Sequence, residues 1–153
     1  MIGVEFRERM AGTWHRLDAP TDERPFAFTA RACVGRLAQF LGGAVARLEG
    51  EVQADGLARS SPLVGTLDLG ALTRARELPY RFRFQGDDGR RYRFDGHKTV
   101  DLMDLPRTMT ILPASVFDDD GREVGRAVLH FDLRADLPGF LRSWRPVVAR
   151  EAR

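Results

Sequence analysis

The sequence contains one cysteine and one lysine, and it has no long apolar run. The lone Cys33 excludes an internal disulfide and any zinc site built on several cysteines. No apolar segment approaches the roughly 20 residues that a transmembrane helix needs. The first dozen residues mix acids and arginines where a signal peptide needs an apolar stretch. We therefore expect a reduced, cytoplasmic setting with no stable membrane insertion.

The charge distribution gives no sign of a nucleic-acid partner. Of the 24 basic residues all but Lys98 are arginine, and 22 acids bring the formal net charge to +2 at pH 7. The chain lacks the cluster of about five or six like charges that marks a phosphate-binding tail. A length of 153 residues with 43% hydrophobic content fits one globular domain. We expect that domain in residues 1–145, followed by a frayed tail in 146–153.

Motifs for nucleophilic or phosphate chemistry are also absent. The serines lack the Gly-x-Ser-x-Gly elbow of hydrolases, and LGGAV lacks the Lys-Ser/Thr of a P-loop. His15, His97 and His130 each alternate with the apolar residues of their own segments, so they are expected on the outside with the arginines. No metal site and no cofactor are predicted.

Apolar and charged residues alternate with a period of two along the chain, which predicts about eight strands. The clearest case is PYRFRFQGDDGRRYRFDGHK at 79–98, where aromatic residues alternate with charged ones on both sides of a Gly-Asp-Asp-Gly turn. A second strand is expected to start at Phe26 and Phe28. Further strands are expected in residues 4–17, 44–54, 63–69, 109–111 and 127–133.

Turn and helix signals divide the strands. Asp-Gly pairs at 55–56, 88–89 and 120–121 supply the positive φ of tight hairpins, and turns are favoured there over calcium loops. Helical spacing appears in CVGRLAQFLGG (33–43), after the second strand, and in DLPGFLRSW (136–144), near the C-terminus. We expect the first helix to cap one end of the domain and the second to pack on its wall.

Sequential antiparallel strands leave two unpaired edges unless the sheet closes on itself. The predicted fold is therefore all-β: an antiparallel barrel of about eight strands, with a short helix after the second strand and a C-terminal helix. A β-sandwich of the same strands is the alternative, because periodicity does not distinguish the two.

The inner side of the predicted strands is largely aromatic. Such residues converge either in a close-packed core or around one small apolar ligand, and the sequence leaves both open. The candidate ligand-binding residues are Phe6, Glu8, Met10, Phe28, Tyr80, Phe82, Phe84, Tyr92, Phe94, Met109 and Phe131.

Glu8 is the polar exception on this inner side. A buried carboxylate is costly unless it is hydrogen-bonded, and the expected partners are the hydroxyl of Tyr80 or Tyr92, or a loop arginine. A β-bulge that turns Glu8 outward is equally open. An inward Glu8 would orient the polar head of a ligand or act as an acid or base. Gly12 and Gly65, on the same register, are expected to leave space inside.

The segment AGTWHRL (11–17) resembles the Gly-x-Trp signature of the lipocalin and fatty-acid-binding (calycin) barrels. In those families the tryptophan lies at the closed end, and an arginine from near the last strand packs over it. The resemblance implies structural roles for Gly12, Trp14 and Arg134, with Arg142 as the second choice of arginine. The sequence departs from lipocalins in lacking their disulfide and signal peptide and in the helix expected after strand two.

A second resemblance covers more of the chain. FRERMAGTW, LEGEVQADGLA, GTLDL, FQGDDGRRYRFDGHK and GREVGRAVLHFDLRADLPGFLRSWR are together similar to barrel-like accessory segments of bacterial glucose-methanol-choline-type oxidoreductase and α/β-hydrolase multidomain proteins. The flavin motif is missing, so no oxidase activity is implied. The resemblance implies a bacterial setting and a link to sterol or lipid metabolism.

The function favoured by these patterns is binding of a small hydrophobic molecule, such as a lipid, sterol or polyketide-like compound, in an aromatic-lined barrel. Two alternatives stay open. One is a cofactor-independent cyclase or isomerase that uses Glu8 in the same cavity. The other is a solid-core accessory module that docks on a lipid-metabolising enzyme. A second copy of this chain, in a homodimer, is the alternative protein partner.

Overall fold

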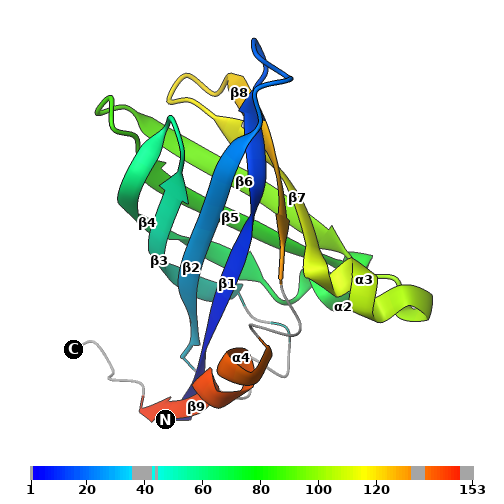
Figure 1. Ribbon diagram of the computed structural model, residues 1–153. Helices are drawn as coiled ribbons and strands as arrows, with labels where there is room; N and C mark the ends of the chain where they lie inside the picture. Colours follow the sequence, from blue (N-terminus) through cyan, green and yellow to red (C-terminus); the bar gives the residue numbers. More distant parts are fainter. Residues whose placement is uncertain (1, 36–42, 44, 132–136, 149–153) are drawn as a thin grey trace.

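The computed structural model describes residues 2–35, 43, 45–131 and 137–148 (Figure 1). Nine strands form one sheet. They are β1 (Ile2–Arg16), β2 (Arg24–Val34), β3 (Val45–Ala54), β4 (Ala58–Asp68), β5 (Glu77–Gln85), β6 (Arg91–Thr99), β7 (Ile111–Phe117), β8 (Glu123–His130) and β9 (Arg145–Val148). The short helical segments are α2 (Ala71–Ala75), η1 (Leu102–Asp104), α3 (Leu105–Thr110) and α4 (Leu137–Ser143).

The sheet closes through β1. Each strand from β2 to β8 pairs antiparallel with the next, while β1 pairs with β2 from Val4 to Trp14 and with β8 from Ala11 to Arg16. The result is an eight-stranded antiparallel barrel in meander order. This confirms the all-β barrel and excludes the sandwich. Strand β9 adds to β1 outside the meander.

The two ends of the barrel differ in their connections (Figure 1). One end, here the turn end, carries the connections β1–β2, β3–β4, β5–β6 and β7–β8. The three predicted Asp-Gly turns lie there, with positive φ at Gly56 (78°), Gly89 (79°) and Gly121 (79°). The opposite end, here the helical end, carries α2, α3 and α4. Each strand of the barrel therefore runs between an end with short turns and an end with longer connections.

The interior is apolar and changes in character along the barrel. Phe28, Phe82 and Phe94 contact one another, with ring centroids 4.5 to 5.8 Å apart. These rings, with their aromatic neighbours toward the turn end, fill that part of the core. Toward the helical end the buried positions of β2 and β3 are aliphatic, with the small Ala30, Ala32 and Ala46 beside Val34 and Leu48.

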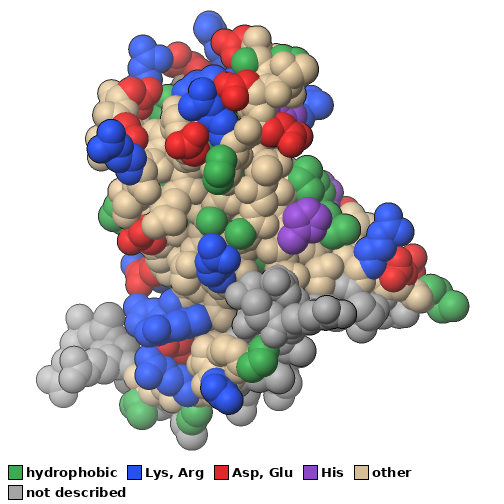
Figure 2. Space-filling view, viewed as in Figure 1, with side chains coloured by type: hydrophobic (Ala, Val, Ile, Leu, Met, Phe, Trp, Pro, Cys, Tyr) green, Lys and Arg blue, Asp and Glu red, His purple; other side chains and the backbone are tan. Residues whose placement is uncertain are grey.

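The outer face carries the charged residues, as the alternation predicts. His97 and His130 are exposed and His15 is partly exposed, so the histidines lie outside the core with the arginines (Figure 2). Gly12 and Gly65 do not leave space. A Cβ at Gly12 would overlap the backbone of Val128, and one at Gly65 would overlap the backbone of Phe82 and its Cβ. Close approach of neighbouring strands, and not an internal void, requires glycine at these two positions.

Several predicted boundaries need correction. Cys33 and Val34, expected to begin a helix, belong to β2, while residues 36–42 and 44 of that segment lie outside the described residues. Met109 lies in α3 and not in a strand, since it belongs to a short helix that begins at Leu105 and has Pro106 in its first turn. Arg134 lies outside the described residues.

The C-terminal segment also differs from expectation. Helix α4 is followed by β9 at residues 145–148, and this strand includes residues 146–148 of the segment expected as a frayed tail. Strand β9 pairs with Ile2–Glu5 of β1. Arg145 at its start donates two hydrogen bonds to Glu5 Oε1, at 2.7 and 3.1 Å. The ladder and this ion pair hold the last strand on the barrel wall.

Glu5 is nearly fully buried beneath these contacts. Burial alone would raise the pKa of the Glu5 carboxyl, but hydrogen bonds from Arg145 and Cys33 and the charges of Arg145 and Arg31 outweigh it and lower the pKa. A carboxyl with a lowered pKa stabilises the fold above its unfolded pKa. That stabilisation is lost as pH falls through the folded value.

We therefore expect Glu5→Gln to lose less unfolding free energy than wild type between neutral pH and about pH 3. Urea denaturation at the two pH values measures this difference. Glu51→Gln, a change at an exposed glutamate of β3, is the matched control and should follow wild type. Parallel acid losses in wild type and Glu5→Gln would contradict the assignment.

Candidate functional site

Three polar side chains meet inside the barrel. Glu8 Oε1 accepts a hydrogen bond from Lys98 Nζ at 2.8 Å, and Glu8 Oε2 accepts one from the Tyr80 hydroxyl at 2.8 Å. Lys98 Nζ also donates to the Tyr80 hydroxyl oxygen at 3.1 Å. We call Glu8, Tyr80 and Lys98 the inner triad. The inward orientation of Glu8 and its predicted bond to Tyr80 are confirmed, and the β-bulge alternative is wrong.

Strand register brings the triad together. Glu8 lies opposite Ala30 in the β1–β2 ladder. In the β5–β6 ladder Tyr80 lies opposite Gly96, and Lys98 lies opposite Leu78. Tyr80 is near the start of β5 and Lys98 near the end of β6, so both approach Glu8 from the helical end of the barrel. The ring of Tyr80 also lies 5.1 Å from Lys98 Nζ, as a cation–π contact.

The triad is a buried ion pair with a hydroxyl bridge. The Lys98 and Glu8 side chains are only 4% and 9% exposed. Burial and the neighbouring Glu8 charge raise the pKa of Tyr80 well above its ordinary value, so Tyr80 stays protonated and donates. Two of the three Lys98 N–H donors are used by these partners. The pairing of Glu8 with Lys98 balances the two charges, and within the described residues one Lys98 donor remains for a further acceptor.

The strand ladder is interrupted beside Glu8. On the side of β1 that faces β8 and β9, pairing covers Ala11–Arg16 and Ile2–Glu5. Within the described part of the chain, residues 6–10 thus have a strand partner only in β2. Ser143 of α4 bridges part of this stretch, since its hydroxyl accepts from the Arg7 N–H at 2.8 Å and donates to the Arg7 carbonyl at 3.3 Å. Among the described residues, Ser143 and the stack of Trp144 on Phe6 contact this stretch of β1 where a strand would otherwise pair.

The other predicted site residues belong to the same core but lie at different positions between the turn end and the helical end of the barrel. Phe6 stacks on Trp144 at the helical end, with centroids 4.7 Å apart. Tyr92 lies toward the turn end, where its hydroxyl donates to Asp88 at 2.6 Å; burial and this bond raise its pKa to about 12. Tyr92 is therefore not a partner of Glu8. The remaining predicted residues are buried (Met10, Phe28, Phe82, Phe84, Phe94) or partly buried against that core (Met109, Phe131).

Trp14 closes the turn end. It is 1% exposed, and its indole N–H donates to the Asp55 carbonyl at 3.0 Å. The guanidinium over its ring is that of Arg16, 5.4 Å from the centroid. The calycin resemblance implies an arginine from near the last strand at this place. In this chain Arg16, two residues further along β1, occupies it.

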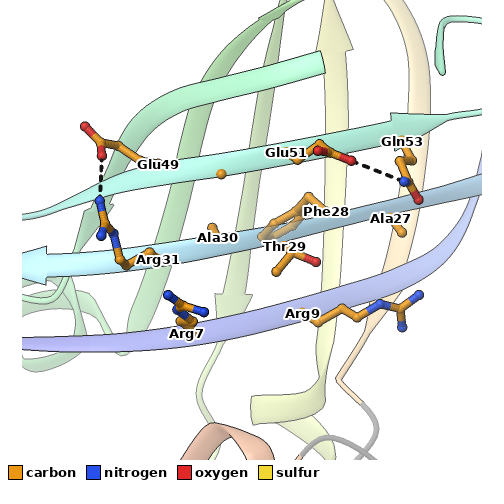
Figure 3. Close-up of a pocket in the computed structure, with 11 residues that line it drawn as sticks. Arg7, Arg9, Ala27, Phe28, Thr29, Ala30, Arg31, Glu49, Glu51 and Gln53 are labelled. Atoms are coloured by element: carbon orange, nitrogen blue, oxygen red, sulfur yellow. Dashed lines mark hydrogen bonds and ion pairs between the residues drawn. The ribbon is translucent and has the colours of Figure 1, made fainter. Parts of the chain in front are cut away.

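Two open grooves lie on the outer wall, and no triad residue lines either of them. One of about 610 Å³ runs over β1, β2 and β3 beside Arg7, Arg9 and Arg31 (Figure 3). The other, of about 880 Å³, lies nearer the turn end. In the first groove Arg31 pairs with Glu49 at 3.1 Å, and Gln53 donates to Glu51 at 3.3 Å. Since these polar groups pair with one another in solvent, we place the candidate site at the buried triad.

Lys98 is the residue that sequence reasoning missed. It lies on the same alternation as Tyr92, Phe94 and Gly96 in β6, so period two already placed it inside. Its being the single lysine of the chain was a second signal. Both were outweighed by the general rule that lysine is almost never buried without a partner.

Comparison with known proteins gives no relative: no protein-family model, no curated protein and no solved structure matches this chain. Among the described helices, none is long and apolar enough to cross a membrane. Function must therefore be argued from the inner triad and the surrounding barrel.

The buried pair makes a sharp stability prediction. Lys98→Met should lower the free energy of unfolding by about 3–5 kcal/mol, because it leaves the Glu8 charge buried without its ion-pair partner. Glu8→Gln/Lys98→Met, which removes both charges, should be clearly more stable than Lys98→Met alone. Urea denaturation measures both.

Arg83→Met, at an exposed β5 position, is the control and should change stability by no more than about 0.5 kcal/mol. A Lys98→Met protein as stable as this control would show that the lysine is not held inside.

Proposed function

We propose that the barrel binds a small apolar molecule whose polar atom lies against the inner triad. The observation that carries this proposal is a hydrogen-bonded Glu8–Tyr80–Lys98 cluster in an otherwise apolar interior. Ligand sites commonly combine an apolar lining with a few placed polar groups. Burial of the apolar part contributes roughly 25 cal/mol per Å² before ordering costs.

The charge of the triad selects the polar group of the ligand. Glu8 and Lys98 neutralise each other at 2.8 Å, so a bound carboxylate would add an unbalanced buried charge. A hydroxyl or carbonyl oxygen adds none, and it can accept the remaining N–H of Lys98. The favoured ligands are therefore neutral oxygen-bearing lipids such as fatty alcohols, sterols, ketones and polyketide-like compounds.

The helical half of the interior is the proposed binding region. Phenylalanine rings occupy the turn half, whereas the inner face near Glu8 carries Ala30, Ala32 and Ala46. In the described part of the chain, residues 6–10 beside this region pair only with β2, and this stretch is the proposed route of access. Trp144, 38% exposed and stacked on Phe6, lies at the same end.

The resemblances noted above agree with such a role. The Gly-x-Trp segment supports a calycin-like carrier, and the longer similarity supports a cytoplasmic partner of bacterial lipid metabolism. An enzymatic role is the second candidate. It is favoured by the direct contact of the Glu8 carboxylate with two proton donors, a geometry suited to proton transfer in a cyclase or isomerase.

Binding is testable with a matched series of decanol, 2-decanone and decanoate. The neutral ligands should raise the melting temperature, by an amount equivalent to about 2.7 kcal/mol at 100 times Kd, and decanoate should raise it less. They should also change the emission of Trp144. In Trp144→Phe the emission response should vanish while the thermal shift remains, since Trp14 lies at the turn end.

Unchanged melting temperature across this series and a sterol would refute the binding proposal. That result would favour the solid-core docking module. Equal shifts with decanoate and decanol would refute the selection by charge.

A further inference from the structure

We propose that Lys98 captures an apolar aldehyde or ketone as an imine within the barrel. This inference rests on the proposed function, because it names the ligand class and the bond that the same site would form. It uses three properties of the inner triad: the residue type at position 98, the proton acceptor beside it and the apolar surroundings.

The residue type is informative because basic positions in this chain are otherwise arginine. Lys98 is the single lysine among 24 basic residues, and it is also the one basic residue among the buried polar side chains of the described chain. Arginine stays protonated in proteins and cannot act as a nucleophile. Lysine can lose its proton when it is buried, and it then attacks carbonyl carbons.

The proton acceptor is already in contact. Lys98 Nζ lies 2.8 Å from Glu8 Oε1, so one proton can pass directly from the ammonium to the carboxylate. This transfer converts an ion pair into a neutral amine and a neutral acid. The net charge of the site does not change, so the transfer leaves no unbalanced charge in the interior. The Tyr80 hydroxyl, 3.1 Å from Nζ, is placed to hydrogen-bond the carbonyl oxygen as it approaches.

The reaction balances without an oxidant or reductant. The neutral Lys98 amine attacks the carbonyl carbon, forming a C–N bond while the C=O π electrons move to oxygen. A proton from the amine nitrogen moves to that oxygen to give a carbinolamine. The Glu8 acid then protonates the hydroxyl, which leaves as water, and a C=N bond forms. The iminium keeps its N–H proton and its positive charge. It therefore stays paired with the Glu8 carboxylate, as the Lys98 ammonium was.

The apolar interior would protect the product. An iminium in water hydrolyses readily, whereas a closed, water-poor site suppresses that side reaction. The Lys98 and Glu8 side chains are 4% and 9% exposed, so little solvent reaches them. Exposed lysines on a protein surface lack both this exclusion and the adjoining carboxylate.

The experiment is reductive trapping on the intact chain. Wild type is incubated with decanal and sodium cyanoborohydride, and the modified residue is identified by peptide mass spectrometry. Arg83→Lys supplies the control in the same molecule, since it adds an exposed lysine on the outer face of β5. We expect decanal to modify Lys98 faster than the introduced lysine, and the polar aldehyde glyceraldehyde to show the opposite order.

Two variants separate capture from mere reactivity. Glu8→Gln, which keeps the amine, should slow decanal trapping at Lys98 by about 100-fold, the lower end of general acid–base catalysis. Lys98→Arg should abolish the adduct and keep the positive charge. Circular dichroism of each variant verifies the fold. The Arg83→Lys comparison keeps both Glu8 and Lys98, so it tests capture even if either variant fails to fold.

The outcomes distinguish this inference from the proposed function. If decanal and decanol both raise the melting temperature but Lys98 reacts no faster than the introduced lysine, imine capture is refuted and binding stands. If neither compound changes the melting temperature and Lys98 is unreactive, both proposals fail. Faster reaction of Lys98 with decanal, reduced in Glu8→Gln, supports capture.

Discussion

Strand β1 pairs with β2 along one side and with β8 along part of the other, and this double pairing closes the sheet. Closure decides which side of every strand is buried, because a strand has only two faces. It brings the aromatic residues of β2, β5 and β6 into one core. It also commits Glu8 to the interior, since its neighbours on the same face are Phe6 and Met10, both buried.

An inward carboxylate is tolerated here because two partners satisfy it. Lys98 supplies the opposite charge and Tyr80 supplies a hydrogen bond, each at 2.8 Å. Such a buried pair adds little net stability compared with apolar residues of similar volume. Stability alone therefore does not account for the pair, and the proposed ligand contact gives it a chemical role. The position of the pair, between the phenylalanine cluster and the small side chains of the helical end, suits a ligand's polar atom.

Much of this architecture follows from local sequence patterns. Strict alternation predicted the strands and the outward histidines, and three Asp-Gly pairs predicted the hairpins. Short helices were missed because α2 and α3 span five and six residues, too few for a helical period to show. Two of the three triad residues, Glu8 and Tyr80, were also predicted. Lys98 was not, because lysine is almost never buried without a partner. Its partner Glu8 lies 90 residues away and comes into contact only when the barrel closes.

Burial of the single lysine is the central claim, and selective acylation tests it most directly. A sulfonated, water-soluble amine reagent should leave Lys98 largely unmodified in the native protein and modify it fully in denaturant. The exposed lysine of Arg83→Lys should react under both conditions. Native-state modification of Lys98 at the rate of an exposed lysine would contradict the buried triad and every proposal built on it.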